Sequence, residues 1–254
     1  MFDVVVIGSG PAGYVAAIRA SQLGLKTLCI EELSNDKGKP NFGGTCLNVG
    51  CIPSKSLLDS SHRYYEAKKN LSDHGIQLGD VKLDLKTMME RKDNIVSKLT
   101  GGIDGLFLTN KVESICGKGK VISKNTVQID KADGSSEKVD AKNIIIATGS
   151  SPIEIPAASF GKHIVDSTGA LAFDSVPKRL GVVGAGIIGL ELGSVWSRLG
   201  SEVTVIEALE DFLPMTDTDI SKESLKEFKK QGLDIQLASK VTSTKELKNL
   251  VKVK

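Results

Sequence analysis

The sequence predicts an α/β fold of two domains, each with a parallel β-sheet and an antiparallel meander of short strands. At the start of the chain, a strand-like apolar run, a G-x-G-x-x-G turn, an amphipathic stretch and a second strand ending in glutamate follow one another, and the same succession recurs from Leu180. Between the two copies, short alternating runs are separated by Gly, Asn and Asp, as antiparallel strands are. We expect the two domains to be residues 1–150 and 151–254.

The first copy begins with Phe2–Ile7, a run that is apolar except for Asp3 and is typical of a buried parallel strand. We expect a helix after the glycine turn, to about Leu23, and the next strand over Lys26–Ile30. That strand ends at Glu31, which lies eighteen positions beyond Gly13. Strand, turn, helix and acid together form a Rossmann-like dinucleotide-binding fingerprint, whereas the glycines alone would also suit an ordinary βαβ turn.

Each part of the fingerprint has a physical task at a nucleotide site. Gly8 permits the tight turn, Gly10 lets a pyrophosphate approach the backbone, and Gly13 lets the helix pack on the strand. The helix N-terminus, at Pro11-Ala12, offers backbone N–H groups and the positive end of the helix dipole to phosphates. Glu31 is placed to accept hydrogen bonds from ribose hydroxyls.

Two cysteines, Cys46 and Cys51, lie five positions apart in Gly43–Lys55, where a glycine-rich loop turns toward a helix. A helix that begins near Cys46 would direct its unpaired N–H groups toward the sulfurs, which favours thiolate and makes the pair reactive. One alternative is an inert core pair, against which the glycines argue because they permit close approach of a ligand. The other is half of a zinc site, but neither Cys-x-x-Cys spacing nor a second Cys or His pair is nearby.

Beyond the cysteines, two charged stretches have helical periodicity, the second across about residues 86–100 with an apolar stripe. Short runs from Val112 to Val139 predict the antiparallel meander. Asn143–Ser150 is expected to form a buried strand that ends in a glycine turn. Ser151–Pro156 is expected to be an extended linker, because its two prolines break helix and strand ladder alike.

The second fingerprint is also complete. Leu180–Val183 is the expected strand, Gly184–Gly189 the turn, and the following strand ends at Glu207, again eighteen positions beyond Gly189. A carboxylate at this place favours ribose hydroxyls and repels the extra phosphate of NADP, and no Lys or Arg follows it through Leu213, so we expect NAD. The residues expected to contact this nucleotide are Gly184, Gly186, Ile187, Ile188, Gly189 and Glu207.

Composition limits the function. Of the 254 residues 40% are hydrophobic and 25% charged, which is ordinary for a globular protein and enough for two domains. The net charge of +2 gives no strong field to recruit nucleic acid or a membrane, and we expect neither as a partner. No apolar stretch has the length of a membrane span and no signal peptide precedes the first strand, so we expect an intracellular protein. Four cysteines are sparse usage, and Cys29 and Cys116 are expected only to pack.

The segment Gly43–Lys55 resembles the redox-active disulfide signature of the class I pyridine nucleotide–disulfide oxidoreductases, and its Cys-Ile-Pro-Ser-Lys end is most similar to the dihydrolipoamide dehydrogenases among them. The resemblance implies FAD in the first domain and the nicotinamide nucleotide in the second. It implies that Cys46 and Cys51 form a disulfide against the flavin, and that Lys55 lies near the flavin ring, paired with Glu191. From its position alone, Glu191 would be a glutamate on a helix surface. The further FAD contacts that the resemblance implies are Gly44, Thr45, Gly117, Ala147, Thr148 and Gly149, with the backbone of Gly117 facing the adenine.

Two nucleotides that share a redox disulfide indicate an electron relay from a dithiol through FAD to NAD. By the resemblance, a substrate thiolate attacks Cys46 and the Cys51 thiolate donates toward the flavin, with Lys55 and Glu191 as further catalytic residues and no metal. The implied partners are dihydrolipoyl groups of 2-oxo acid dehydrogenase or glycine cleavage complexes, and a second copy of the full-length chain in a homodimer. The implied location is cytoplasmic, or the mitochondrial matrix for a processed eukaryotic chain.

The resemblance extends over essentially all 254 residues but over only about the first half of a family member. The rest of the nicotinamide domain, a second FAD-contacting Gly-Asp segment, the dimerisation domain and a His–Glu catalytic base have no counterpart in the sequence. General-base assistance contributes about 10²–10⁴-fold to a rate. A second hypothesis is therefore an incomplete or inactive FAD- and NAD-binding fragment, and a third is a related disulfide reductase of the glutathione or mercuric reductase type.

Overall fold

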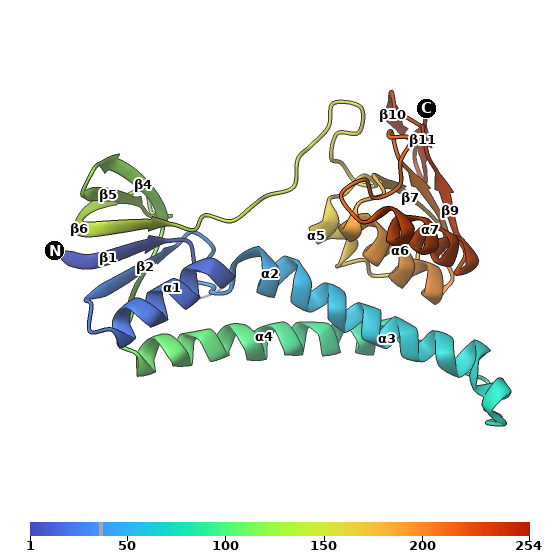
Figure 1. The fold of residues 1–254 in the computed structure, drawn as a ribbon, viewed down its shortest axis with the longest axis horizontal. Coiled ribbons are helices and arrows are strands. Elements are labelled where there is room, and N and C mark those ends of the chain that lie inside the picture. The colour runs from blue at the N-terminus through green and yellow to red at the C-terminus, as the bar shows by residue number, and fades with distance from the viewer. Residues whose placement is uncertain (36–37) are drawn as a thin grey trace. The chain divides into compact units, whose positions relative to one another are not determined.

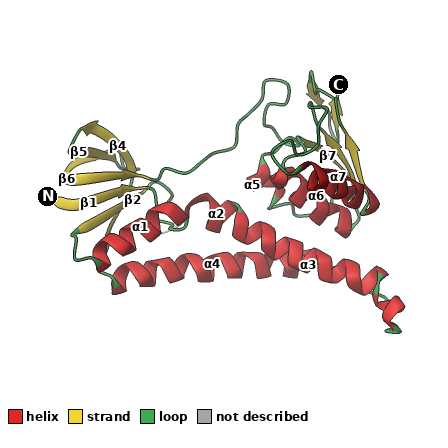
Figure 2. Cartoon of the chain, in the orientation of Figure 1, coloured by secondary structure: helices red, strands yellow, loops and turns green. Residues whose placement is uncertain are grey.

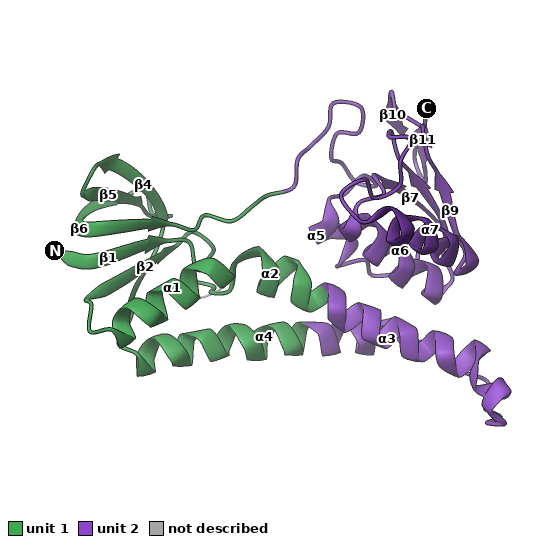
Figure 3. Ribbon diagram, viewed as in Figure 1, with its two compact units in different colours: residues 1–53, 93–151 green, residues 54–92, 152–254 purple. Residues whose placement is uncertain are grey.

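A computed structural model describes residues 1–35 and 38–254 of the chain (Figure 1, Figure 2). These residues fall into two compact units, shown in Figure 3. Unit 1 consists of residues 1–53 and 93–151, and unit 2 of residues 54–92 and 152–254. The division near residue 151 lies where the linker was expected, whereas residues 54–92, which lie within the predicted first domain, group with unit 2. The assignment of one nucleotide to each predicted domain stays a prediction.

Unit 1 is built on one six-stranded sheet. Its elements are β1 (Phe2–Ile7), α1 (Pro11–Gln22), β2 (Thr27–Glu31), α2 (Gly44–Val49), β3 (Glu113–Cys116), β4 (Lys118–Ser123), β5 (Thr126–Asp130) and β6 (Ser136–Ile146). The strand order is β3-β2-β1-β6-β5-β4. β1 pairs in parallel with β2 and β6, and β2 pairs in parallel with β3, whereas β4, β5 and β6 pair antiparallel. The predicted parallel sheet with an antiparallel meander is therefore confirmed.

β6 joins the parallel strands to the meander. Its residues 136–140 pair with β5, and its residues 141–146 pair with β1. The predicted return strand from Asn143 is thus the second half of a longer strand, which ends at Ile146. The expectation that it is buried was wrong, because Ile145 and Ile146 are exposed. Successive residues of β1 enter opposite cores: Val4 packs in a cluster with Ala17 of α1, and Val5 packs in a cluster with Val127 of the meander. Burial on both sides explains why the last four residues of this strand, Val4 to Ile7, are all apolar.

Two long helices, α3 (Cys51–Lys69) and α4 (Leu85–Thr109), contribute residues to both units. The sequence predicted that the second helix ends near Thr100, and that prediction was wrong, because the helix continues to Thr109 through three glycines of low helix propensity. Ile103 and Phe107 of this last part are buried in the core of unit 1, and the Phe107 ring lies 4.7 Å from that of Phe42. Burial of these apolar side chains outweighs the cost of the glycines. Among the described residues no helix combines the length and the apolar character that crossing a lipid bilayer requires.

Unit 2 contains a three-stranded parallel sheet and a separate antiparallel pair. Its further elements are the 3₁₀-helix η1 (Leu71–His74), α5 (Ser167–Ala170), β7 (Arg179–Val183), α6 (Ile187–Leu199), β8 (Glu202–Ile206), α7 (Thr218–Lys230), β9 (Leu233–Gln236), β10 (Thr244–Glu246) and β11 (Val251–Val253). The sheet has the order β7-β8-β9, and β10 pairs with β11. One glycine turn followed by a helix thus occurs in each unit, which confirms the predicted fold class of two Rossmann-like domains.

An apolar cluster of unit 2 attaches α3 and α4 to α6. Leu57 of α3, Trp196 of α6 and Leu171, which directly follows α5, are buried together. Met88 and Met89 of α4 pack against them. Two polar bonds close the cluster at the end of α5: the Trp196 Nε1–H donates to the Ala170 carbonyl at 3.1 Å, and the buried ammonium of Lys92 donates to the Leu171 carbonyl at 3.0 Å.

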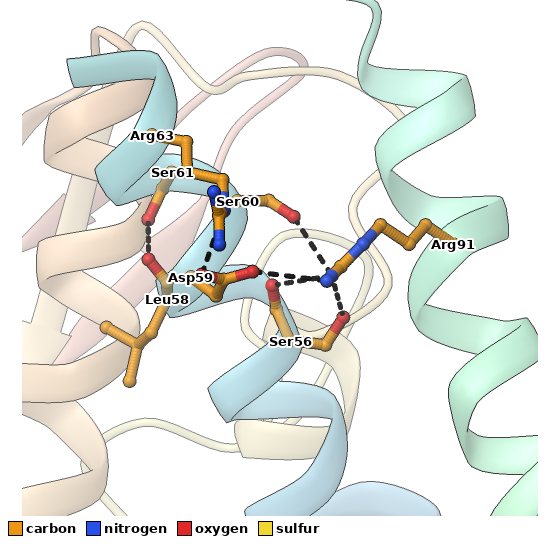
Figure 4. Close-up of polar contacts among 7 residues, drawn as sticks. All are labelled: Ser56, Leu58, Asp59, Ser60, Ser61, Arg63 and Arg91. Carbon is orange, nitrogen blue, oxygen red and sulfur yellow. Dashed lines mark hydrogen bonds and ion pairs between the residues drawn. The ribbon is translucent and has the colours of Figure 1, made fainter. Parts of the chain in front are cut away.

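Arg91 connects the facing sides of α3 and α4 (Figure 4). Its guanidinium donates to Ser56 Oγ at 3.0 Å, to Ser60 Oγ at 3.3 Å and to Asp59 Oδ2 at 3.1 Å. Arg63 donates to the other oxygen of Asp59 at 3.0 Å. The planar donor set of arginine is suited to holding several acceptors at once, so this cluster fixes the register of the two helices.

Candidate functional site

The first glycine turn links β1 to α1 and requires glycine at two of its three positions. Gly8 has a φ of +99°, and a Cβ there would lie 2.2 Å from the Ala147 carbonyl oxygen. A Cβ on Gly13 would lie 1.8 Å from the Gly8 carbonyl oxygen. Gly10 differs, because a Cβ on it would meet nothing closer than the Gly44 Cα at 3.8 Å. Two glycines therefore make the turn possible, and the third leaves space above it.

The start of α1 offers hydrogen-bond donors toward that space. The helix begins at Pro11, its N-cap residue is Gly10, and no side chain caps it. Pro11 and Ala12 are exposed, whereas Gly13 is buried. The first N–H groups of a helix have no partner within the helix, and together with the helix dipole they form a site for an anion such as phosphate.

Glu31, at the end of β2, is held beside the same turn. Its side chain is 5% exposed and accepts hydrogen bonds from the Ser9 N–H at 2.9 Å, from the Ser9 hydroxyl, and from the Leu33 N–H at 2.8 Å. These bonds compensate the burial of its charge. The backbone of Gly117 is also close, since its N–H donates to the Glu31 carbonyl at 2.8 Å. The structure thus brings the predicted acid, turn and Gly117 to one end of the sheet.

The cysteines lie on two successive helices, of which the first begins near Cys46 as expected. Cys46 is the third residue of α2, and Cys51 is the first residue of α3. Gly50 separates the helices, and a Cβ on it would lie 3.3 Å from the Cys46 Cα, so the chain folds back closely on Cys46 before it reaches Cys51. Cys46 is half-buried and Cys51 is exposed. The disulfide between them stays a prediction.

The α2 helix is seated directly on the first glycine turn. The Gly43 N–H donates to the Ser9 carbonyl at 3.0 Å, and a Cβ on Gly44 would lie 2.7 Å from the Gly10 Cα. The Thr45 hydroxyl donates to the Ser150 carbonyl at 3.1 Å, just beyond the predicted FAD contacts Ala147, Thr148 and Gly149. Glycine turn, cysteine-bearing helix and the end of β6 therefore form one contiguous surface of unit 1.

In unit 2, Lys55 and Glu191 form the ion pair that the family resemblance implied. The Lys55 Nζ lies 2.6 Å from Glu191 Oε1, and the Ser54 hydroxyl donates to Glu191 Oε2 at 3.3 Å. The lysine side chain is 59% exposed and the glutamate side chain 23% exposed. An ammonium that is held by one partner and still accessible can interact with a further group.

The second glycine turn, between β7 and α6, repeats the geometry of the first. Gly184 has a φ of +97°, and a Cβ on Gly189 would lie 2.6 Å from the Gly184 carbonyl oxygen. A Cβ on Gly186 would meet no atom within 4 Å, and no side chain caps α6. Glu207 accepts from the Ala185 N–H at 2.8 Å and from the Leu209 N–H at 2.9 Å. Ile187 and Ile188, at the start of α6, are exposed.

Comparisons with known proteins place this arrangement in a family. The family model described as pyridine nucleotide-disulphide oxidoreductase matches residues 2–254. The chain belongs to this family.

Curated relatives in the family are close in sequence but longer. The chain is 55% identical over 240 residues to the leghemoglobin reductase of Vigna unguiculata, an alignment that covers 94% of this chain and 45% of that protein. It is 52% identical over 256 residues to the dihydrolipoyl dehydrogenase of Cupriavidus necator, covering 100% of this chain and 54% of that protein. The chain thus spans about half the length of the curated relatives it matches.

A solved structure of the same kind agrees with the fold. The HOCl-induced flavoprotein disulfide reductase RclA from Escherichia coli superimposes with a TM-score of 0.82 at 28% identity, covering 99% of this chain and 52% of that chain. Membership in the pyridine nucleotide-disulphide oxidoreductase family implies FAD and NAD as the cofactors of this chain.

Some polar residues of the family site were not predicted from the sequence. Ser9 donates to Glu31, and Ser54 donates to Glu191. The side chains of Asn41 and Asn48 bond to one another beside the cysteines. Ser9 lies inside the first G-x-G-x-x-G turn, so its place in that motif was a signal for its role. The hydrogen bonds of Asn41 and Asn48 depend on how the loop folds back, for which the sequence has no periodic signal.

The other two cysteines differ from the redox pair in their surroundings. Cys29 is fully buried, and burial, reinforced by the nearby Glu31 carboxylate, raises the pKa of its thiol to about 12. Burial and Glu31 also raise the pKa of the Cys116 thiol. Both thiols therefore stay protonated at neutral pH, in agreement with the packing role predicted for them. Within the part of the chain that the structure describes, no three His, Cys, Asp or Glu side chains gather as ligands of a metal ion would.

Proposed function

We propose that this chain forms the FAD- and NAD-binding part of a disulfide oxidoreductase of the dihydrolipoyl dehydrogenase type, which passes electrons from dihydrolipoyl groups through Cys46 and Cys51 and FAD to NAD. The observation that supports this most directly is the contact of α2, the helix that bears Cys46, with the first glycine turn, to which we assign the FAD. The sequence similarity to dihydrolipoyl dehydrogenases supports the substrate class.

The residues of both units fit the two cofactors. Gly10 and Gly186 leave open space above each turn, and the uncapped starts of α1 and α6 offer N–H groups to a pyrophosphate. Glu31 and Glu207 keep acceptor capacity for ribose hydroxyls, because a carboxylate has about four lone-pair positions and fewer are used by the backbone and Ser9. When bound, FAD supplies a two-electron carrier between a dithiol and a pyridine nucleotide.

The cysteines take up the electrons by thiol–disulfide exchange. One thiolate of the dihydrolipoyl group attacks the Cys46 sulfur, so that a mixed disulfide forms and the Cys46–Cys51 bond breaks to leave a Cys51 thiolate. The second substrate thiolate then attacks the substrate sulfur of the mixed disulfide and releases Cys46. The substrate leaves as a cyclic disulfide, oxidised by two electrons, and the two cysteines are left reduced by the same two electrons.

Two features of the chain are proposed to assist this exchange. Cys51 opens α3, a helix of 19 residues, so the thiolate that forms there lies at the positive end of a helix dipole. Lys55, held by Glu191, is proposed to provide a positive charge beside the flavin, and Glu207 to select NAD. The implied partners, lipoyl-bearing 2-oxo acid dehydrogenase or glycine cleavage complexes and a second copy of the chain, belong to the same proposal, as does a location in the cytoplasm or mitochondrial matrix.

A purified sample tests the proposal in three steps. The chain is reconstituted with FAD and the bound flavin is measured by absorbance, thiols of the denatured chain are counted before and after reduction, and oxidation of dihydrolipoamide is followed with NAD. The proposal expects one FAD per chain and two additional thiols after reduction, which disappear in Cys46→Ser and Cys51→Ser but not in Cys116→Ser. Flavin binding and thiol cycling without turnover would identify the chain as a cofactor-binding fragment, and failure to bind flavin would refute the proposal.

A further inference from the structure

Asn48 lies between the two cysteines and makes three hydrogen bonds that no periodic pattern predicts. Its amide group donates to the Phe42 carbonyl at 3.1 Å and to the Gly44 carbonyl at 2.9 Å. Its oxygen accepts from the Asn41 side chain at 2.9 Å. With both its donors and its acceptor engaged, the partly buried amide has one defined orientation.

These bonds close a ring that includes the predicted ribose-binding acid. The Asn41 N–H donates to the Leu33 carbonyl at 2.8 Å, and the Leu33 N–H donates to the Glu31 carboxylate at 2.8 Å. Glu31 accepts from the Ser9 N–H, and the Ser9 carbonyl accepts from the Gly43 N–H at 3.0 Å. The chain from Gly43 through α2 leads back to Asn48. The helix that bears Cys46 is therefore connected to the first glycine turn twice, once through Gly43 and once through Asn48.

Helix α2 needs such support. It has six residues, its N-cap is Gly43 without a side-chain cap bond, and its C-cap is Gly50. A helix this short is not stable by itself, because nucleation costs more than so few hydrogen bonds return. Cys46 belongs to α2 and Cys51 to α3, so the distance between their sulfurs depends on contacts that hold one helix against the next.

We propose that Asn48 is a positioning residue that keeps Cys46 opposite Cys51 while the sulfurs are not bonded to one another. The inference rests on the proposed function, in which these two residues exchange two electrons. When the disulfide is closed, the S–S bond of about 2.05 Å fixes both helices by itself. When it is open, the bonds of Asn48 hold α2 in place, so the two thiols stay close. The disulfide then forms again without any repositioning of α2.

The consequence is thermodynamic. Two thiols held close to their bonded geometry have a high effective concentration, and this favours the disulfide over the dithiol. Loss of the Asn48 bonds would give α2 more freedom in the dithiol state only, where the S–S bond is absent. The disulfide of such a variant would be easier to reduce. A residue that merely stabilised the fold would affect both redox states alike and leave the equilibrium unchanged.

The test is the redox equilibrium of the full chain with mixtures of reduced and oxidised dithiothreitol. In that exchange the two protein thiols lose two electrons and two protons as dithiothreitol disulfide gains them. Alkylation with N-ethylmaleimide followed by mass spectrometry gives the fraction of Cys46 and Cys51 that is reduced. For Asn48→Ala we expect the equilibrium constant for disulfide formation to fall about tenfold, which for a two-electron couple is about 30 mV.

Asn110 provides a matched control at the end of α4. Its amide donates to the carbonyl four residues back, on Leu106, at 2.8 Å, and its oxygen accepts from Gln22 at 3.2 Å, so it has counterparts of two of the three bonds of Asn48, away from the cysteines. Asn110→Ala is expected to leave the redox equilibrium unchanged. Asn41→Ala, which removes only the bond to the Asn48 oxygen, is expected to cause a smaller shift in the same direction.

The outcomes separate this inference from the proposed function. If the unmodified chain forms no Cys46–Cys51 disulfide, the proposed function fails and the inference fails with it. If the unmodified chain cycles but Asn48→Ala has the same equilibrium constant within twofold, Asn48 is not a positioning residue. Should Asn48→Ala not fold, Asn41→Ala decides, and an unchanged equilibrium in that variant overturns the inference. Urea unfolding of the oxidised variants confirms that they are folded when compared.

Discussion

Lys55 Nζ lies 2.6 Å from Glu191 Oε1, although the two residues are 136 positions apart in the chain. Lys55 stands on α3, one turn after the helix begins, and Glu191 stands on α6, two residues after the second glycine turn. The helices are held together by the buried cluster around Leu57 and Trp196, so the pair has an apolar support beneath it. This contact connects the cysteine segment of the sequence with the second nucleotide fingerprint.

We predict that Glu191→Gln affects electron transfer more than stability. An ion pair as exposed as this one contributes about 0–1 kcal/mol to the free energy of unfolding. If Lys55 supplies a charge to the bound flavin, loss of its partner leaves the ammonium free to move, and flavin reduction by dihydrolipoamide should slow about tenfold, a loss of about 1.4 kcal/mol in transition-state stabilisation. Stopped-flow flavin absorbance and urea unfolding measure the two effects.

The exposed pair of Lys226 and Glu223 on α7, with 3.3 Å between its charged atoms, is the control for this experiment. Glu223→Gln should alter neither flavin reduction nor stability by a measurable amount. Equal effects of Glu191→Gln and Glu223→Gln on flavin reduction would show that the pair at Lys55 has no role in electron transfer.

The two kinds of glycine in the first turn should respond differently to a methyl group. Gly10→Ala adds a Cβ whose nearest neighbour would be the Gly44 Cα, at an ordinary contact distance of 3.8 Å, and the backbone φ of −65° suits alanine, so the chain should fold with nearly unchanged stability. The methyl group would occupy the space proposed for the pyrophosphate, and FAD affinity should fall at least about tenfold, or about 1.4 kcal/mol. Fluorescence titration with FAD measures this. Retention of full affinity would contradict the proposed binding mode.

Gly13→Ala is expected to act on the fold. Its Cβ would lie 1.8 Å from the Gly8 carbonyl oxygen, which is backbone and cannot move without opening the turn. Overpacking of this kind costs about 1–3 kcal/mol or more, which urea unfolding of the flavin-free chain measures. In the second turn, Gly189→Ala and Gly186→Ala should repeat the contrast, because their Cβ atoms would meet the Gly184 oxygen at 2.6 Å and open space, respectively.

The sequence was informative where function depends on a local pattern. Each glycine turn, its helix and its acid lie within one βαβ unit, so their spacing alone predicted that these parts occur together. The hydrogen bonds of Glu31 and Glu207 to the N–H groups of Ser9 and Ala185 were not predicted, and the role of both acids at a ribose stays a prediction. The Lys55–Glu191 contact came from the family resemblance and from no local pattern. The end of α4 was misjudged, because its glycines indicate a stop while the burial of Phe107, a long-range contact, decides otherwise.

The hydrogen bonds of Asn48 and Arg91 could not be predicted for a related reason. Both side chains bond across a change of chain direction, and most of their partners are backbone carbonyls or serine hydroxyls, which occur everywhere in a sequence. The grouping of residues 54–92 with unit 2 likewise depends on the apolar cluster around Trp196. Such contacts are set by tertiary packing rather than by residue spacing.

Glu207 should determine the choice between NAD and NADP. Its carboxylate is fixed by the Ala185 and Leu209 N–H groups, so a phosphate on the adenine ribose would meet a negative charge that cannot turn away. Glu207→Gln removes the charge and keeps the shape. We expect NADH affinity to fall about tenfold and the preference for NADH over NADPH to narrow by a similar factor. Fluorescence titrations with both nucleotides measure this, and Glu210→Gln, at an exposed neighbouring position, should leave the preference unchanged.

Cys29 should make the protein less stable in alkaline solution. Its pKa is raised from 9.0 to about 12 by burial in the folded chain, with a contribution from Glu31. Below pH 9 the thiol is protonated in both states, and its contribution to stability is complete. Between pH 9 and 12 the unfolded chain releases a proton that the folded chain retains, so the free energy of unfolding falls by about 1.4 kcal/mol per pH unit.

In Cys29→Ala this contribution is absent. The difference in unfolding free energy between wild type and Cys29→Ala, measured by urea unfolding, should therefore be constant up to about pH 9 and should shift by about 2 kcal/mol at about pH 10.5, in favour of the variant. Other groups titrate equally in both proteins and cancel in the difference. A difference that stays constant to pH 10.5 would show that the Cys29 thiol ionises in the folded chain as readily as in the unfolded one.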